Sequence, residues 1–453
     1  MPTNSAHSEQ LSNGRLRSEY YEPIPPNYFA PKPGDEVLNI GIVGAGIAGL
    51  ATASALLQSG HHVFERSCFA NEIGAAINMC PNASRVLSYL EFNFHRARPV
   101  TLDEQRLTDG RTLEVRRTQF TPDFKDLYGA PFLLYHRADL HNELKRTATE
   151  PRPHTSNVAK IHLSANVVDI SLDGEISLYD GTKYMKDVVI VADGISTRFA
   201  SKVVDSGEDL RIYPTGSMAY RFLVPAEKLM EDPQTRHLFE GEAMKMVISP
   251  AGDKRLVWYP CRGGELQNFG FFLPDDIEGF EDEVWSIPAS REKFMKASTE
   301  LHPDLQAVCG KAEDLKLWRL CSRKKPLSKL ARGQVVLIGD AAHPMLPHQG
   351  QGGAMAIEDA AALGVLLSGV RSKDAIPERL QQFEQLRLKR VAAMVIFSSV
   401  GQDEAHRIKD IVRPFVDGPL PSCPAEYHMY NFTPNVLRDA MELLESNQNS
   451  ARL

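Results

Sequence analysis

The sequence lacks the features that mark several large classes of protein. Its six cysteines include no Cys-x-x-Cys pair, which argues against a zinc site or a disulfide framework and fits a reducing compartment. The apolar run at residues 391–397 is far shorter than the about 20 residues that a membrane-spanning helix needs. No charged and then apolar leader opens the chain, so we expect a cytoplasmic protein.

Positive charge is also in short supply. Lysine and arginine number 51 against 58 aspartates and glutamates, a net charge of −7, so no basic excess favours binding to nucleic acid. The chain is 43% hydrophobic and 24% charged, as is typical of globular proteins. Its 453 residues predict two or three domains with a substantial core. We therefore expect small-molecule partners and a monomer or homodimer.

Regular structure is not expected at the N-terminus. Residues 1–36 are polar and carry six prolines, and such a segment buries too little apolar surface to offset its ordering entropy. We predict a disordered extension there. Residues 37–43 then form a short apolar run rich in β-branched residues, which predicts a buried parallel strand.

A glycine-rich turn follows that strand. Gly44, Gly46 and Gly49 have the Gly-x-Gly-x-x-Gly spacing, a helical stretch comes next, and a second short strand ends on Glu65. In such a βαβ unit the first glycine permits a tight turn, the second lets the backbone approach a pyrophosphate, and the third allows close helix–strand packing. Glu65 is expected to accept hydrogen bonds from ribose hydroxyls.

Two further buried strands are predicted at residues 186–192 and 334–338. The second breaks at Gly339-Asp340, and since ligands bind at the carboxyl ends of parallel strands, Asp340 is a candidate ligand contact. Patterns between about residues 213 and 318 predict antiparallel strands. We predict an α/β fold: a Rossmann-type dinucleotide-binding domain, an inserted mixed or antiparallel sheet, and a helical C-terminus.

The chain resembles the class A FAD-dependent aromatic monooxygenases, in particular the salicylate-hydroxylase-like branch common in fungal aromatic polyketide pathways. Between Gly60 and Glu65 it has about two residues fewer than that family usually has, a change that keeps side chains on the same strand face. Besides the glycine turn, the resemblance rests on residues 74–77 with 81–83, residues 136–140, residues 193–198 and residues 339–360.

The resemblance implies FAD as cofactor and NAD(P)H as co-substrate. A helix starting at the Gly350–Gly353 loop would aim its dipole at a flavin ring lying against the backbone, and would stabilise negative charge on the reduced ring. Arg198 belongs to the motif that the family associates with flavin and nicotinamide binding. The implied cofactor contacts are Gly44, Gly46, Gly49, Glu65, Ala76, Arg137, Asp193, Asp340, Gly350, Gly352 and Gly353.

The resemblance and the strand pattern together divide the chain into regions. After the disordered extension we expect a discontinuous FAD-binding domain at residues 37–95, 131–205 and 325–375, a substrate domain at 96–130 and 206–324, and a helical C-terminal region at 376–453.

Arg221 and Tyr259 are the candidate catalytic residues. Fungal relatives that hydroxylate or dearomatise phenols use an arginine and a tyrosine at these motif positions to hold the substrate's phenolate. A fixed guanidinium lowers the pKa of a phenol by charge pairing, and a tyrosine donates a hydrogen bond to the same oxygen. Arg255, four positions before Tyr259, would share its strand face. The alternative is that Arg221 and Tyr259 only stabilise the sheet.

The predicted reaction is hydroxylation of a phenolic substrate of secondary metabolism, through a C4a-hydroperoxide of the flavin, with dearomatisation or decarboxylation as open variants. The alternative enzyme is a flavin-dependent epoxidase or reductase of a non-aromatic substrate. A different class is a non-catalytic binding module, against which Asp340 and the intact glycine loop argue. We expect His343 and His348, which flank that loop, to be structural rather than catalytic.

Overall fold

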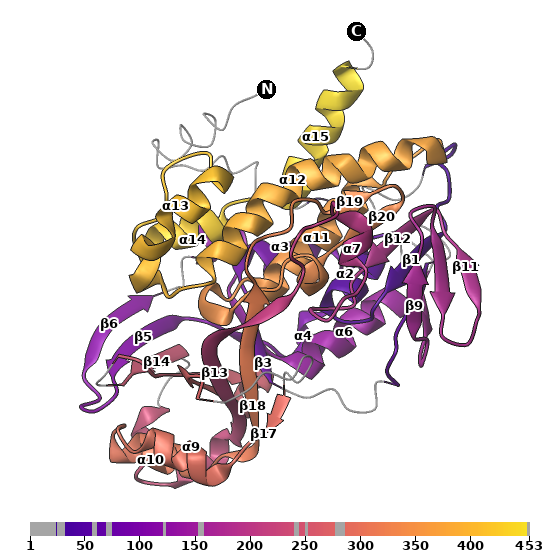
Figure 1. Ribbon diagram of the computed structural model, residues 1–453. Coiled ribbons are helices and arrows are strands. Elements are labelled where there is room, and N and C mark those ends of the chain that lie inside the picture. Colours follow the sequence, from indigo (N-terminus) through magenta and orange to yellow (C-terminus); the bar gives the residue numbers. More distant parts are fainter. Residues whose placement is uncertain are drawn as a thin grey trace.

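The computed structural model describes residue 24 and residues 32–56, 61–68, 75–120, 124–152, 158–239, 244–249, 252–276 and 286–450. The predicted disordered extension therefore lies outside the described residues, apart from residues 24 and 32–36. Figure 1 shows two large sheets, with the long helix α12 (Ile376–Phe397) at the end of the molecule away from α9 (Arg291–Ser298) and α10 (Pro303–Gly310).

A mainly parallel sheet of six strands lies in one part of the molecule. Its order is β19-β20-β12-β1-β2-β8, and only the edge strand β19 pairs antiparallel. The valines and isoleucines of its central strands are buried, as in parallel sheets covered on both faces. The strands are β1 (Ile40–Val43), β2 (His62–Phe64), β8 (Lys160–His162), β12 (Val188–Val191), β19 (Ala331–Arg332) and β20 (Val335–Leu337), so the predicted strands are confirmed but shorter.

Helices from distant parts of the sequence pack together around this sheet. The helix α11 (Gly352–Leu366) contacts α2 (Ile47–Ala55), α3 (Pro81–Tyr89) and α15 (Val436–Ser450), and α2 also contacts α6 (Arg137–Thr149). Most of α11 is buried because apolar residues occur on all its faces. It therefore forms the centre of the largest hydrophobic core.

The second large sheet has eight strands in the order β17-β18-β13-β16-β15-β14-β5-β6. All neighbours pair antiparallel except β14 and β5, which are parallel. One face packs on α9 and α10 through an aromatic core. The strands are β5 (Glu104–Asp109), β6 (Val115–Phe120), β13 (Ile212–Pro225), β14 (Met244–Ile248), β15 (Arg255–Cys261), β16 (Leu266–Pro274), β17 (Ser286–Pro288) and β18 (Glu313–Arg323).

Two small antiparallel sheets complete the β-structure of the described residues. One contains β3 (Ala76–Met79), β7 (Leu133–His136) and β4 (Val100–Thr101), and the other β9 (Val167–Ile170), β10 (Glu175–Leu178) and β11 (Lys183–Met185). Short helical segments connect the sheets: α4 (Phe94–Ala97), α5 (Phe124–Tyr128), α7 (Ala200–Val203), α8 (Ala226–Glu231), η2 (Arg236–Leu238), η3 (Arg262–Gly264), η4 (Gly339–Ala341), η5 (Pro347–Gln349) and η6 (Lys373–Ala375).

The region after residue 375 is helical, as predicted. It contains α12, α15 and the shorter η7 (Gln402–Ile408), α13 (Lys409–Val412), η8 (Arg413–Phe415) and α14 (Pro424–Phe432). Pro377 lies in the first turn of α12, where a proline's missing N–H leaves no partner unsatisfied. Among the helices of the described residues, none combines the length and apolar character that crossing a membrane requires.

Candidate functional site

The glycine turn between β1 and α2 has the geometry of a nucleotide-binding turn. Gly44 has a φ of +99°, which glycine adopts readily. A Cβ on Gly49 would lie 2.0 Å from the Gly44 carbonyl oxygen, so only glycine allows the helix to pack this closely. A Cβ on Gly46 would meet no atom within 4 Å, so the N-terminus of α2 faces open space there.

Glu65 reaches this turn although β2 is short. Its Oε2 accepts a hydrogen bond from the Ala45 N–H at 2.9 Å, and its Oε1 accepts one from the Ser67 N–H at 2.8 Å. A residue that the sequence motifs did not indicate holds the turn from the other side: the buried Nε2 of His141, on α6, lies 2.8 Å from the Ala45 carbonyl oxygen. The two residues fewer before Glu65 therefore do not displace it from the turn.

Asp193 lies just beyond β12 and beside the glycine turn. A Cβ on Gly44 would lie 2.9 Å from the Asp193 Cα. The Oδ1 of Asp193 is buried and has no hydrogen-bond partner within the protein. Burial raises the pKa of Asp193 to about 6, although its hydrogen bond with Thr197 opposes the rise. Since buried polar atoms are nearly always paired, this oxygen fits a contact with a bound polar ligand.

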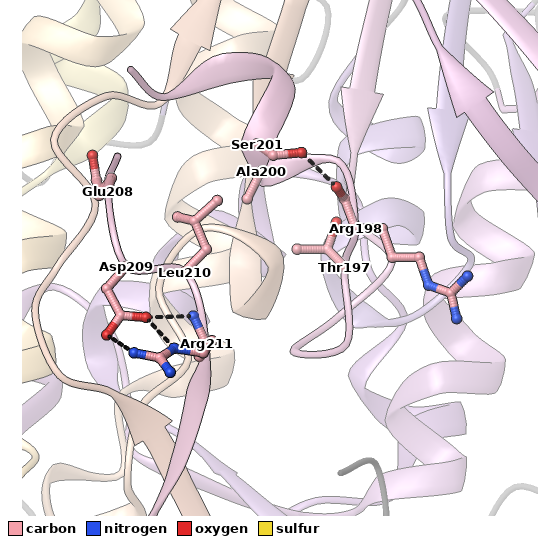
Figure 2. A pocket seen from close by; sticks show the side chains of 8 residues that line it. All are labelled: Thr197, Arg198, Ala200, Ser201, Glu208, Asp209, Leu210 and Arg211. Carbon is pink, nitrogen blue, oxygen red and sulfur yellow. Dashed lines mark hydrogen bonds and ion pairs between the residues drawn. The ribbon is translucent and has the colours of Figure 1, made fainter. Parts of the chain in front are cut away.

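Arg198 lines a surface pocket of about 410 Å³ next to this motif. Figure 2 shows that its side chain points away from Arg211, which is held across the pocket by Asp209. The Arg211 Nε lies 2.8 Å from the Asp209 Oδ1, so that pair contributes little net charge. The other lining residues are Thr197, Ala200, Ser201, Glu208 and Leu210.

Asp340 lies in η4, which follows β20 after Ile338. Asp340 as a residue is exposed to solvent. Many protein atoms nevertheless surround its carboxyl group, and this desolvation raises its pKa. The charges of His343, Arg137 and Arg323 oppose that rise. Arg137 is the first residue of α6, directly after β7, and its own N–H donates to the Ala75 carbonyl oxygen at 2.8 Å.

The three glycines of the 350–353 loop have different surroundings. Gly350 has a φ of +62°, and a Cβ there would lie 2.7 Å from the Asn78 Nδ2, which donates to the Gly350 carbonyl oxygen at 3.0 Å. A Cβ on Gly353 would lie 2.8 Å from the Met79 Cε. Only Gly352 faces open space, at the N-terminus of α11. Two glycines thus allow β3 to pack on the loop, and one leaves room for a ligand.

Ala76 lies in β3, the strand that joins this loop to the eight-stranded sheet. Its side chain is buried, and its N–H donates to the Oδ1 of Asn268 on β16 at 3.1 Å. Asn268 therefore links the two parts of the molecule at the site, and no sequence motif indicated it.

These features fit FAD. The N-termini of α2 and α11 offer N–H groups beside Gly46 and Gly352, where a ligand would meet no Cβ. Asp193 has a buried oxygen without a partner, and Asp340 is accessible beside three cationic or basic side chains. A long ligand with an anionic pyrophosphate, ribose hydroxyls and a planar ring would use these features together.

Arg221 and Tyr259 are brought together on one face of the eight-stranded sheet. Arg221 on β13 pairs with Gly270 of β16, and Tyr259 on β15 pairs with Asn268 of the same strand. Residues 268 and 270 share a face, so both side chains rise on the same side of β16 with no side chain at Gly270 between them. Arg255 pairs with Phe272 on this face too, as expected.

The charges of the two residues affect each other. Burial raises the pKa of Tyr259 above its usual value, and the positive charge of Arg221 opposes this effect. Burial lowers the pKa of Arg221, Tyr259 opposes that shift, and Arg137 adds to it. The charge of Arg137 thus affects both the substrate candidate Arg221 and the cofactor candidate Asp340.

An aromatic wall adjoins Tyr259. It consists of Phe124 and Tyr128 of α5, Phe132, and Phe432 of α14, all buried in one hydrophobic cluster with Tyr259. Phe432 comes from the C-terminal region, and no motif pointed to it, because its contacts span about 300 positions of sequence. Trp258, Phe269 and Phe271 face the other side of the sheet and belong to the aromatic core.

The two histidines near the glycine loop have structural surroundings. His343 is buried, and its Nε2 lies 2.6 Å from the Asp359 Oδ2. The ring of His348 lies 6.4 Å from that of Phe272, measured between centroids. His343 therefore has a structural contact with the buried Asp359 carboxylate on α11.

Comparison with known proteins identifies the family. The family model described as an FAD binding domain matches residues 181–398. The chain is 33% identical over 393 residues to an FAD-dependent monooxygenase of Diaporthe leptostromiformis, phomE', covering 86% of this chain and 98% of that one. It is 32% identical to hispidin-3-hydroxylase of Neonothopanus nambi (78% and 86% covered) and 30% identical to 3-hydroxybenzoate 6-hydroxylase 1 of Aquipseudomonas alcaligenes (82% and 90%).

Solved structures show the same fold. A salicylate hydroxylase substrate complex matches with a TM-score of 0.66 at 24% identity, covering 91% of this chain and 95% of that one. CtdE in complex with FAD and a substrate matches with a TM-score of 0.73 at 20% identity, covering 92% and 100%. Together with the curated relatives, and with a site whose features fit FAD, these matches show that the chain belongs to the FAD-dependent monooxygenases.

Proposed function

We propose that this monooxygenase hydroxylates a phenolic substrate of secondary metabolism, with FAD, NAD(P)H and O2, in the cytoplasm. The observation that carries the proposal is the convergence of Arg221 and Tyr259 on one sheet face, beside Gly270 and an aromatic wall. An anion-binding pair next to a dry aromatic surface suits a phenolate ring. The names of relatives such as hispidin-3-hydroxylase and 3-hydroxybenzoate 6-hydroxylase 1 support an aromatic substrate.

The residues expected to hold FAD fall into three groups. Gly46, with Gly44 and Gly49 shaping the turn, would admit the pyrophosphate, and Glu65 the ribose. Bound FAD supplies electrons taken from NAD(P)H and an activated oxygen for transfer. The remaining proposed contacts, toward the ribityl chain and the ring, are Ala76, Arg137, Asp193, Asp340, Gly350, Gly352 and Gly353.

We assign Arg221 and Tyr259 the role of binding the substrate as its phenolate anion. The Arg221 guanidinium pairs with the phenolate oxygen and so lowers the phenol's pKa. Tyr259 stays protonated at neutral pH because burial raises its pKa, so its hydroxyl donates a hydrogen bond to the same oxygen. Deprotonation makes the ring more nucleophilic, and the aromatic wall keeps water away from it.

Replacement of Arg221 by alanine tests this role. We expect Arg221→Ala to lower kcat/KM for phenol-stimulated NAD(P)H oxidation at least 100-fold, about 2.7 kcal/mol of transition-state stabilisation. The flavin content should stay at the wild-type level. The assay uses orcinol-like, salicylate-like and polycyclic phenols, with product detected by mass spectrometry.

The matched control is Arg407→Ala, since Arg407 is exposed and pairs with Glu404 away from the site. Loss of flavin from Arg221→Ala would overturn its assignment to the substrate. Full activity in the double variant Arg221→Ala/Tyr259→Phe would instead support a flavin-dependent epoxidase or reductase of a non-aromatic substrate.

A further inference from the structure

A buried cluster of four charged side chains joins α11 to α12. We call it the charge cluster; its members are Glu358, Asp359, Arg387 and Arg390. The side chains of Glu358, Asp359 and Arg387 are each 1% exposed, and that of Arg390 is 13% exposed. The charge cluster lies on α11 and α12, outside the sheet face that carries Arg221 and Tyr259. We assign it no contact with the phenolic substrate.

One carboxylate of the cluster holds the turn that carries Asp340. The Oδ2 of Asp359 accepts a hydrogen bond from the Gly339 N–H at 3.0 Å and lies 2.6 Å from the Nε2 of His343. Its Oδ1 accepts one from the Arg387 Nε at 2.9 Å. The residue directly before Asp340 is thus tied, through a single carboxylate, to a guanidinium on α12.

The other carboxylate is connected to the glycine loop. Glu358 accepts two hydrogen bonds from Arg390, at 2.7 and 2.8 Å, and also pairs with Arg387. Its Oε1 also accepts a hydrogen bond from the Nδ2 of Asn82 at 2.6 Å, and that same amide group donates to the Oε1 of Gln351 at 3.0 Å. Gln351 is fully buried and immediately precedes Gly352, the glycine that faces open space.

The electrostatics of the cluster depend on both arginines. Two adjacent carboxylates inside the protein would be costly to ionise alone, and burial does raise their pKa values. For Glu358 the charges of Arg390 and Arg387 outweigh this effect, for Asp359 those of His343 and Arg387 do, and both pKa values fall to about 2. The carboxylates are therefore charged at neutral pH, and removal of Arg387 leaves an uncompensated buried charge.

We propose that Arg387 is a positioning residue for FAD. Through Asp359 and Glu358 it sets the relative position of the two loops that present Asp340 and Gly352 to the cofactor. The helix α12 begins at Ile376, beyond the predicted end of the FAD-binding domain at residue 375, so the cofactor site would extend into the C-terminal region. The inference concerns FAD alone and is independent of the substrate's identity.

Titration of the apoprotein with FAD tests the proposal. We expect Arg387→Met, which keeps an unbranched apolar stem but removes the guanidinium and its charge, to raise the Kd for FAD at least tenfold, measured by quenching of FAD fluorescence. The absorption band of bound flavin should lose resolved structure. Arg407→Met is the control and should bind FAD like the wild type.

A second variant separates positioning from simple stability. Arg387→Met/Asp359→Asn removes one charge of each sign, so the cluster stays neutral and thermal unfolding of the apoprotein should return toward the wild-type midpoint. We expect its Kd for FAD to remain raised, because the tie from Gly339 to α12 is still broken. Recovery of wild-type FAD affinity in the double variant, or wild-type affinity in a folded Arg387→Met protein, would overturn the proposal. If the single variant does not fold, the double variant carries the test.

Discussion

Gly46 and Gly49 lie three residues apart in one turn, but their surroundings are opposite. A methyl group on Gly46 would meet nothing within 4 Å, whereas one on Gly49 would lie 2.0 Å from a backbone oxygen. Glycine at position 46 thus leaves space for a ligand, whereas glycine at position 49 allows the helix to pack on the turn. The Gly-x-Gly-x-x-Gly pattern alone does not reveal this difference.

These surroundings predict different effects of the same substitution. Gly46→Ala should leave the apoprotein's free energy of unfolding within about 0.5 kcal/mol of the wild type and weaken FAD binding at least tenfold. Gly49→Ala should destabilise the apoprotein by about 3 kcal/mol or more, because the backbone must move. Urea unfolding and FAD titration measure the two effects. A stable Gly49→Ala apoprotein, or unchanged FAD affinity in Gly46→Ala, would contradict them.

At the scale of single elements, the packing of α14 involves a buried histidine, His428. The ring of His428 stacks on Phe432, with centroids 5.0 Å apart, and meets Phe124 edge-on at 5.2 Å. Burial lowers the pKa of His428 to about 4, and the charge of Arg117 adds to the shift. Between about pH 4 and 6.5 the unfolded chain therefore binds more protons at this residue than the folded one.

Stability should consequently rise with pH across that window, by up to about 1.4 kcal/mol per pH unit for this histidine, and be fully present above pH 6.5. His428→Phe keeps the aromatic packing and should reduce the slope of unfolding free energy against pH. The check is urea unfolding at several pH values from 4.5 to 7.5, with the exposed His95→Gln as control. An unchanged slope in His428→Phe would show that the ring does not titrate as the structure implies.

Prediction from sequence worked where the signal is local. The strands before Gly44, Asp193 and Asp340 were found because short runs of valine and isoleucine end at a glycine or an aspartate. Local patterns do not report which distant segments meet, so the parallel pairing of β5 with β14 had no signal in the sequence.

The same limit applies to the candidate site. Phe432 and Arg387 approach it from the C-terminal region, where no family motif marks them. Gly350 and Gly353 also pack closely on Asn78 and Met79, neighbours from β3 that the glycine-rich pattern does not indicate, and the contact of this loop with a flavin ring stays a prediction. The roles of Arg221 and Tyr259 and the domain boundaries stay predictions.

At the scale of the whole molecule, the features that fit FAD come from widely separated stretches of the chain. They lie on the turn after β1, beyond β12 and β20, and at the start of α11, and Asn268 ties β3 to the eight-stranded sheet. A ligand bound to all of them stabilises the folded state as a unit.

We therefore expect the FAD-loaded protein to lose its bound-flavin signal and its far-UV circular dichroism at one midpoint. Free FAD at 100 times its Kd should stabilise the protein by about 2.7 kcal/mol relative to the apoprotein. Calorimetry with parallel flavin fluorescence checks both values. Release of flavin well below the unfolding transition would show that the cofactor is held by one part of the molecule only.

The order of strands in the six-stranded sheet has a consequence for biosynthesis. Ile40 of β1 pairs with Val188, and Val189 of β12 pairs with Val335, so the middle of the sheet is completed only after three quarters of the chain has been made. At about 5–20 residues per second, ribosomes would leave the edge of β1, and then that of β12, unpaired for roughly 7–30 s each. Because such edges template aggregation, chains truncated before residue 335 should accumulate as insoluble material.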